Sequence, residues 1–298
     1  MSNASKIPER LRIGTRGSRL ALAQTELFIS RIKEFYPDVV CEKVIIRTTG
    51  DKILDRPLVD FGGKAVFVSE FEQAISDGTL DCAVHSAKDL PTELAEGLTA
   101  VCVLPREDAR DVLLTRAGSA DAPHVIGTGS MRRQAQVREW YPDAVCRSLR
   151  GNVPTRIEKL RTGEYDGIIL AAAGLKRLGL DRESDLSYRY FTEEEMVPAG
   201  GQGIIVIEGR NEDLAFYEKL TDKEAAQALA IERFVLEKLQ ADCHEAVGVY
   251  AKPCITPEGA GIHLSLMREV DGTVVKRQEA ALRENWKITA QKLTEQMK

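Results

Sequence analysis

Ser86, Lys88 and Asp89 form a polar group directly after a predicted hydrophobic strand at residues 81–85. In an open α/β sheet, ligands bind outside the carboxyl ends of the strands, so this position makes the three side chains candidates for a site. An aspartate there can pair with a ligand N–H group or a developing positive charge, and a lysine can hold a carboxylate. The alternative interpretation is a local ion pair on the surface.

Arginines gather in turns after three other predicted strands. At residues 126–134, small residues and the hydroxyls of Thr128 and Ser130 precede two arginines at the start of a helix, and the turn at residues 148–156 repeats the arrangement. Helix N-termini attract anions, and a guanidinium binds a carboxylate bidentately. The arginines at these three strand ends are Arg16, Arg132, Arg133, Arg150 and Arg156. We expect them to face an acidic ligand in a cleft, with solvated arginines on capped surface helices as the alternative.

Cys243 is the best candidate for a nucleophile among the six cysteines. It lies in a polar loop at residues 240–248, whereas Cys82 and Cys102 lie within apolar runs. Free cysteines are usually structural, so context alone leaves that role open. No CxxC pair occurs and only four histidines are present, so neither a metal site nor a disulfide framework is indicated. His85 is interpreted as packed or hydrogen-bonded rather than as a metal ligand.

The charge of this 298-residue chain is segregated along its length. The net charge is −5, but residues 132–177 hold ten Lys and Arg against five Asp and Glu, giving +5 there and −10 elsewhere. A basic segment in an acidic chain favours a discrete anionic ligand over a nucleic acid, and a solvated basic face is the alternative. No apolar run approaches the roughly 18 residues of a membrane span, and residues 1–10 do not resemble a signal sequence. We therefore expect a cytoplasmic protein that binds neither nucleic acid nor membrane.

Short β-rich runs alternate with amphipathic stretches through the first two thirds of the chain. Strands are predicted at residues 11–15, 40–48, 81–85 and 99–104, with helices at 18–35, capped by Ser18, and 66–76. After Pro105, strands are predicted at residues 111–115, 125–127, 144–148 and 167–170, with helices at 131–140 and 153–162. This alternation predicts two mostly parallel, doubly wound sheets. The run at residues 204–207 is a further strand that can rejoin the first sheet.

The last part of the chain has a different pattern. A helix is predicted at residues 225–239, then the Cys243 loop, strands at 247–251, 262–267 and 273–279, and a final helix, which together indicate a small α+β domain. The predicted domains are residues 1–104 with 199–218, residues 105–198, and residues 219–298.

Seven motifs in one order resemble those of the hydroxymethylbilane synthase family, also called porphobilinogen deaminase. They are GTRGSRLAL (14–22), GGK (62–64), VHSAKDLPTE (84–93), GTGSMRRQ (127–134), LRGNVPTR (149–156), AAGLKRL (172–178) and GQG (201–203). Together they span most of the chain and are far more specific than a single glycine-rich loop.

The resemblance implies a monomeric transferase of tetrapyrrole, porphyrin and heme biosynthesis. Its fold would comprise two α/β domains of periplasmic-binding-protein-like type around a cleft, plus a small α+β C-terminal domain. Four porphobilinogen molecules would be joined head to tail with loss of ammonia, on a dipyrromethane primer attached covalently to Cys243, and hydroxymethylbilane would be released.

The resemblance also implies roles for individual residues. Asp89, with Lys88, is the implied catalytic group that binds pyrrole N–H groups and stabilises the cation formed as ammonia leaves. The primer is implied to contact Ser86, Lys88, Asp89, Thr128, Ser130, Arg132, Arg133, Arg150 and Arg156. The substrate is implied to contact Arg16, Ser18, Lys64, Arg150, Arg156 and Arg177.

Several residues depart from the family pattern. Asp242, His244, Glu245 and Ala246 stand where Gly, Gln, Val and Pro are familiar, Gly129 replaces a serine, and Gly200 replaces a valine. These departures concern affinity and domain motion more than reaction type. The main rival function is a solute- or effector-binding protein, because a hinged pair of α/β domains with an arginine-lined cleft describes those proteins equally well.

Overall fold

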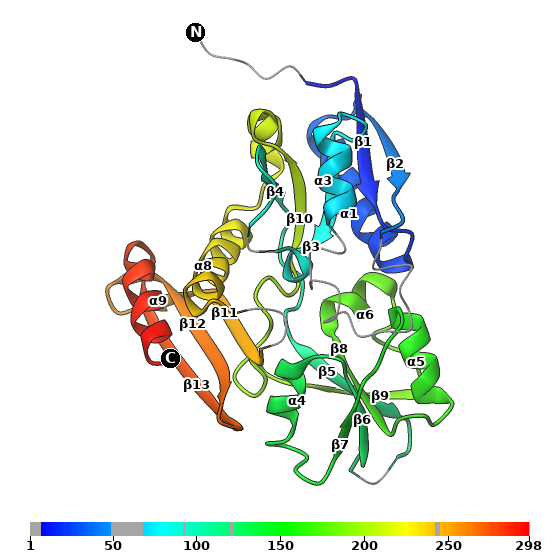
Figure 1. Ribbon diagram of the computed structural model, residues 1–298, viewed down its shortest axis with the longest axis vertical. Coiled ribbons are helices and arrows are strands. Elements are labelled where there is room, and N and C mark those ends of the chain that lie inside the picture. The colour runs from blue at the N-terminus through cyan, green and yellow to red at the C-terminus, as the bar shows by residue number, and fades with distance from the viewer. Residues whose placement is uncertain (1–6, 49–67, 92, 120–121, 242–244, 298) are drawn as a thin grey trace. The chain divides into compact units, whose positions relative to one another are not determined.

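The computed structural model describes residues 7–48, 68–91, 93–119, 122–241 and 245–297 (Figure 1). The chain divides into two compact units. The first comprises Met1–Arg106 and Ile204–Gln227, and the second comprises Glu107–Gly203 and Ala228–Lys298. Within the described ranges, no helix has both the length and the apolar character needed to cross a membrane.

The first unit is built on a five-stranded sheet in the order β2-β1-β3-β10-β4. The strands are β1 (Arg10–Thr15), β2 (Val40–Ile45), β3 (Cys82–Ser86), β4 (Leu98–Val103) and β10 (Ile205–Arg210), and the helices include α1 (Arg19–Phe35), α3 (Ser69–Ser76), α7 (Leu214–Tyr217) and the start of α8 (Lys223–Leu239). Strand β1 runs parallel to β2 and β3, whereas β10 runs antiparallel to β3 and β4. The prediction that residues 204–207 rejoin the first sheet is confirmed.

Helix α1 forms where the sequence supplies both a cap and a buried stripe. The Ser18 hydroxyl accepts a hydrogen bond from the Ala21 backbone N–H at 3.2 Å, which satisfies one of the free donors of the first turn. Phe28 and Ile32, four residues apart, lie on the same face and are fully buried in the core beneath the sheet. The helix therefore covers one face of the sheet and begins at its carboxyl edge.

The second unit contains a sheet of the same plan in the order β7-β6-β8-β5-β9. Its strands are β5 (Asp111–Arg116), β6 (Val125–Gly127), β7 (Val145–Arg147), β8 (Gly167–Ala171) and β9 (Leu186–Tyr190), with helices α4 (Met131–Val137), α5 (Val153–Arg161) and α6 (Ala172–Leu178). Strand β6 is parallel to β7 and β8, and β5 is antiparallel to β8 and β9.

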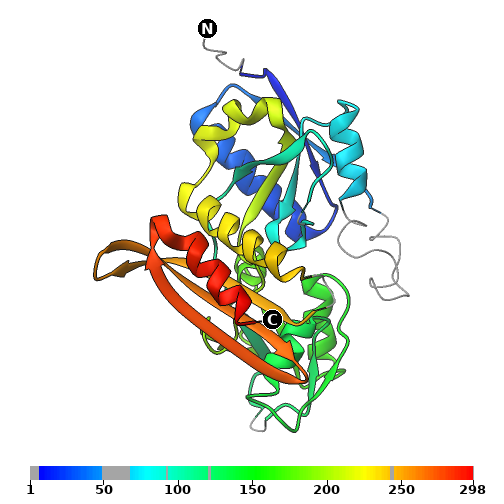
Figure 2. The same cartoon turned by 60° about the vertical axis from the view of Figure 1, so that its left-hand side comes forward.

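A three-stranded antiparallel sheet completes the second unit. It consists of β11 (Val247–Thr256), β12 (Gly259–Val270) and β13 (Thr273–Leu282) and is followed by α9 (Trp286–Glu295). Figure 2 shows α9, in red, lying across the orange strands of this sheet. Side chains of α8 and α9 form a core with one face, whereas Tyr250 and Met267 pack with Ala135 of α4.

The predicted fold class is confirmed in its two α/β sheets and its small α+β portion. Both large sheets are mixed rather than mostly parallel, because each includes one strand, β5 or β10, that runs against its neighbours. Helices α6 and α7 and strand β9 were not predicted. In α6, Gly174 weakens the helical signal, since glycine has low helix propensity.

Candidate functional site

In the first unit, the predicted polar residues come together at one edge of the sheet. Residues Ile13 and Gly14 of β1 pair with Cys82 and Ala83 of β3 in parallel, so the carboxyl ends of both strands lie at the same edge. Arg16 follows β1 there. The segment from Ser86 through the short 3-10 helix Ala87–Asp89 follows β3 at the same edge (Figure 1).

The two serines at this edge make different hydrogen bonds. The Ser18 hydroxyl caps α1, and the Ser86 hydroxyl accepts a hydrogen bond from Gln24 Nε2 at 2.9 Å. Gln24 lies on the buried face of α1 and was not predicted as a site residue. The sequence feature that could have identified Gln24 is its place among the apolar positions of an amphipathic helix, because a buried side-chain amide needs a hydrogen-bond partner.

The carboxylate of Asp89 also lies at this edge, just after β3. It is exposed, and no hydrogen bond or ion pair to its side chain occurs among the described residues. The backbone around it is fixed, because Ala87 N–H donates to the Ile204 carbonyl at 3.0 Å and Leu90 N–H donates to the Ala87 carbonyl at 3.3 Å. Lys88 is half-buried beside it. A carboxylate held on a fixed backbone is available to a ligand.

His85 is hydrogen-bonded, as expected. Its Nε2 atom lies 2.9 Å from Oε2 of the fully buried Glu208, and its ring packs edge-on against Phe71. Within the described residues, no cluster of three or more His, Cys, Asp or Glu side chains that could hold a metal is present.

In the second unit, the carboxyl ends of β6, β7 and β8 meet at one edge. Thr128, just after β6, is buried, and its N–H donates to the Arg147 carbonyl at the end of β7 at 2.9 Å. Asp111 lies at the same edge because β5 runs antiparallel to β8 and pairs Asp111 with Ala171. The hydroxyl of Ser130 accepts a hydrogen bond from the Arg133 backbone N–H at 3.4 Å and so caps α4.

Arg132 and Arg133 are buried and share the carboxylate of Asp111. Arg132 Nη1 lies 2.7 Å from Asp111 Oδ2, and Arg133 Nε and Nη2 lie 2.9 and 2.7 Å from Asp111 Oδ1. Burial alone would raise the pKa of Asp111, but the two guanidinium groups outweigh burial and lower the pKa to about 2. Gln202 Nε2 also donates to Asp111 Oδ1 at 3.1 Å.

This buried cluster has one positive charge more than it has negative charges. Arg132 donates to the Val197 carbonyl at 2.7 Å and Arg133 donates to the Ile169 carbonyl at 3.1 Å, but Arg132 Nε is buried without a hydrogen-bond partner among the described residues. Sequence reasoning missed Asp111, because only the antiparallel course of β5 brings it to this edge.

Two of the remaining predicted arginines of the second unit, Arg156 and Arg177, have backbone partners. Arg156 Nε donates to the Gly151 carbonyl at 2.7 Å, and Arg177 Nη2 donates to the Gly203 carbonyl at 2.6 Å. Burial lowers the pKa of Arg177 to about 10, so it stays protonated at neutral pH. In the part of the chain that the structure describes, neither Arg150 nor Arg177 forms an ion pair with a carboxylate.

Cys243 and Lys64 lie outside the described residues, so their predicted roles stay predictions. The structure does report on the cysteines expected to be structural. Cys82 and Cys102 are fully buried in the first unit, and burial raises the pKa of both thiols, that of Cys102 to about 12. They are therefore protonated and unreactive at neutral pH.

Comparison with known proteins gives one family. A family described as "Porphobilinogen deaminase, dipyromethane cofactor binding domain" matches residues 11–218. The porphobilinogen deaminase of Lachnospira eligens is 43% identical over 265 residues, covering 86% of this chain and 88% of the relative. The probable porphobilinogen deaminase of Archaeoglobus fulgidus is 44% identical over 249 residues, covering 82% and 84%. Among solved structures, the BenM effector-binding domain with benzoate covers 73% of this chain and 96% of that chain at 13% identity, with a TM-score of 0.42.

Proposed function

Because this chain belongs to the porphobilinogen deaminase family and is thus a transferase, we propose that it joins four porphobilinogen molecules head to tail. It then releases the linear tetrapyrrole hydroxymethylbilane by hydrolysis. The observation that best supports the chemistry is Asp89, whose exposed carboxylate has no partner among the described residues although its backbone is fixed at the end of β3.

The arginines of the second unit fit a group that carries several carboxylates. Arg132 and Arg133 share the single carboxylate of Asp111, and Arg132 Nε has no acceptor in the described structure. Arg177 is half-buried, its Nε atom has no hydrogen-bond partner in the described structure, and it forms no ion pair with a carboxylate of the described residues. A buried cation without a counter-charge is costly, so an acidic ligand at these groups would be stabilising.

We assign the dipyrromethane primer to this group of cations and to the polar residues of the first unit. It would be attached covalently to Cys243, and it would be held by Ser86, Lys88, Asp89, Thr128, Ser130, Arg132, Arg133, Arg150 and Arg156. When bound, the primer would supply the pyrrole carbon to which the first unit is joined, and each later unit would be joined to the unit before it. Arg16, Ser18, Lys64, Arg150, Arg156 and Arg177 are assigned to the incoming substrate.

The main task of the protein is to stabilise charge. At each addition, the C–N bond of the substrate's aminomethyl group breaks, a C–C bond forms, and ammonia leaves with the hydrogen displaced from the ring carbon. Positive charge develops on the substrate ring, and Asp89 stabilises it while accepting a hydrogen bond from the ring N–H. Lys88 and the arginines hold the acetate and propionate arms, which fixes the ring relative to Asp89.

Turnover measurements test this proposal. Purified protein supplied with porphobilinogen should release four ammonia molecules for each tetrapyrrole, and Cys243→Ser should abolish product formation, because it has no site of attachment. A Cys254→Ser variant, which removes a half-buried cysteine of β11, is the matched control and should keep activity. Binding of porphobilinogen without ammonia release by the unaltered protein would refute the proposal and favour a binding protein. We also propose that the enzyme is a cytoplasmic monomer that binds neither nucleic acid nor membrane.

A further inference from the structure

A buried glutamate of α8 accepts hydrogen bonds from two separate stretches of backbone. Glu232 is fully buried, and its Oε2 atom accepts a hydrogen bond from the Gly201 N–H at 2.7 Å. Its Oε1 atom accepts one from the N–H of Ala251, on β11, at 2.8 Å. Hydrogen bonds to a carboxylate are about twice as strong as those between neutral groups. The side chain therefore connects α8 both to β11 and to residues 198–203, which we call the glycine segment.

The glycine segment lies close against α8 and β11. Val249 N–H donates to the Pro198 carbonyl at 2.8 Å. A Cβ on Gly200 would meet Leu236 Cδ1 at 2.8 Å and Val249 Cγ1 at 2.9 Å, so the backbone approaches this closely because residue 200 is a glycine. This close approach brings the next N–H, that of Gly201, within reach of a carboxylate on α8.

The same segment contacts Arg177, which the proposed function assigns to the substrate. The Gly203 carbonyl accepts a hydrogen bond from Arg177 Nη2 at 2.6 Å and another from the Glu107 N–H at 3.1 Å. Arg177 Nε is buried and has no hydrogen-bond partner within the described ranges. The Gly203 carbonyl is therefore the acceptor that orients this guanidinium among the described residues.

Gly201 and Gly203 are separated by Gln202 alone, and a tight turn fixes them relative to each other. Gln202 N–H donates to the Ala199 carbonyl at 2.9 Å, and Gly201 within this turn has a φ of 77°, which glycine adopts without strain. The Gln202 side chain also donates to the Ala109 carbonyl at 2.6 Å. A shift of Gly201 would therefore also shift the carbonyl that accepts the hydrogen bond from the arginine.

We propose that Glu232 is a positioning residue that orients Arg177, through the glycine segment, for binding of a porphobilinogen carboxylate. This inference rests on the proposed function, since it takes Arg177 as a contact of the substrate. Glu232 is fully buried, so it acts through the backbone and not on the substrate itself. An arginine that is already oriented loses less conformational freedom when the substrate binds, which strengthens binding.

The test measures KM and kcat for ammonia release in Glu232→Leu and Glu232→Gln, each alone and combined with Arg177→Gln. Leucine removes both acceptor oxygens, whereas glutamine presents an NH₂ donor to one of the two backbone N–H groups. Each substitution should raise KM for porphobilinogen about two- to tenfold, the range expected for loss of one hydrogen bond, with kcat within about twofold of wild type. In the Arg177→Gln background the same substitutions should leave KM unchanged, because the arginine through which they act is absent.

These measurements separate positioning from a purely structural role. A carboxylate that only stabilises the fold would lower the melting temperature and the amount of folded enzyme, but KM does not depend on the amount of folded enzyme. Each variant is assayed well below its own melting temperature, measured by calorimetry. Glutamine matches glutamate in size, so Glu232→Gln decides the question if Glu232→Leu does not fold.

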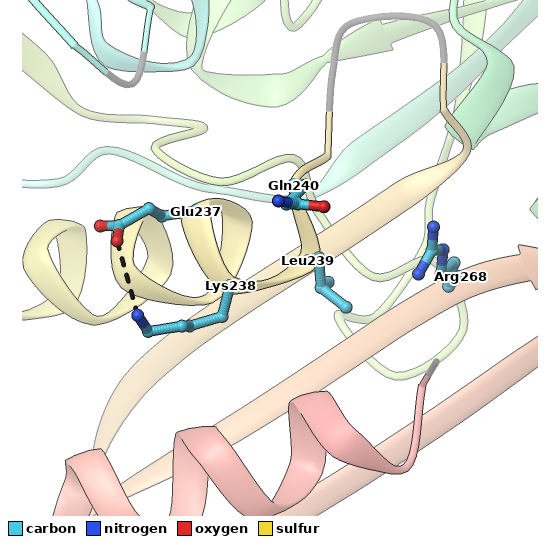
Figure 3. Close-up of a pocket in the computed structure, with 5 residues that line it drawn as sticks. All are labelled: Glu237, Lys238, Leu239, Gln240 and Arg268. Carbon is cyan, nitrogen blue, oxygen red and sulfur yellow. Dashed lines mark ion pairs between the residues drawn. The ribbon is translucent and has the colours of Figure 1, made fainter.

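The matched control is Glu237→Gln, on the same helix. Glu237 is exposed and lies 3.6 Å from Lys238 near the end of α8 (Figure 3), so this substitution removes a surface carboxylate and should leave KM at the wild-type value. A wild-type KM in a folded Glu232 variant, or a KM that rises equally with and without Arg177, would overturn the inference. Failure of the unaltered protein to release ammonia would instead refute the proposed function.

Discussion

Replacing Asp111 with asparagine tests whether one buried carboxylate holds the arginine cluster together. The substitution keeps the shape of the side chain but removes the negative charge that Arg132 and Arg133 share. Breaking a buried ion pair by removing one partner typically costs about 3–5 kcal/mol, because a charge is left uncompensated. We expect a loss of this size in the free energy of unfolding at pH 7.

The pH dependence of the free energy of unfolding gives a second, independent measure of how much the Asp111 carboxylate stabilises the protein. The pKa of Asp111 falls from an ordinary 3.8 to about 2, which corresponds to about 2 kcal/mol of stability. Because the pKa is lower in the folded state, this stability is fully present above about pH 4 and is lost as the pH falls toward 2. Asparagine does not titrate, so the difference in the free energy of unfolding between wild type and Asp111→Asn should narrow by up to about 2 kcal/mol over that range.

Urea unfolding between pH 7 and pH 2.5 measures both effects. The control is Asp185→Asn, which removes a carboxylate that pairs with Arg161 at 2.7 Å on the surface and should leave stability almost unchanged. The reasoning would be refuted if Asp111→Asn lowered the free energy of unfolding by less than about 1 kcal/mol at pH 7. It would also be refuted if the difference in this free energy between wild type and variant did not change with pH.

Three further substitutions give different expectations. Asp89→Asn should leave the melting temperature unchanged, because the side chain is exposed, but should lower kcat about 10²- to 10³-fold; a kcat within tenfold of wild type would remove Asp89 from the mechanism. Arg177→Gln should raise KM for porphobilinogen about tenfold or more with little change in kcat, and an unchanged KM would contradict its assignment to the substrate. Gly200→Val should destabilise by about 1–3 kcal/mol in calorimetry, since a Cβ there meets Leu236 Cδ1 at 2.8 Å and Val249 Cγ1 at 2.9 Å; equal stability would show that these neighbours move freely.

The residues at the strand ends were predictable because they depend on local patterns. A short apolar run followed by small and charged residues marks the end of a strand in an α/β sheet, and Ser86 to Asp89 stand at such an end in the structure. Ser18 and Ser130 cap the helices that follow them, as their position before an amphipathic stretch suggests.

The partners of these residues were not predictable from local patterns. Asp111 precedes Arg132 by 21 residues, and the two meet only because β5 runs antiparallel beside β8. The sequence likewise did not indicate that Arg132 and Arg133 are buried, since an arginine pair after a glycine-rich turn is typical of exposed anion sites. Residues that are far apart in the sequence cannot be recognised as an ion pair until the order and direction of the strands are known.

Intact mass spectrometry of the purified protein tests the central claim most directly. If the chain works on a dipyrromethane primer attached to Cys243, the mass should exceed that of the sequence by two pyrrole units, and the excess should be absent in Cys243→Ser. Active protein whose mass equals that of its sequence, or an excess that persists in Cys243→Ser, would contradict the account.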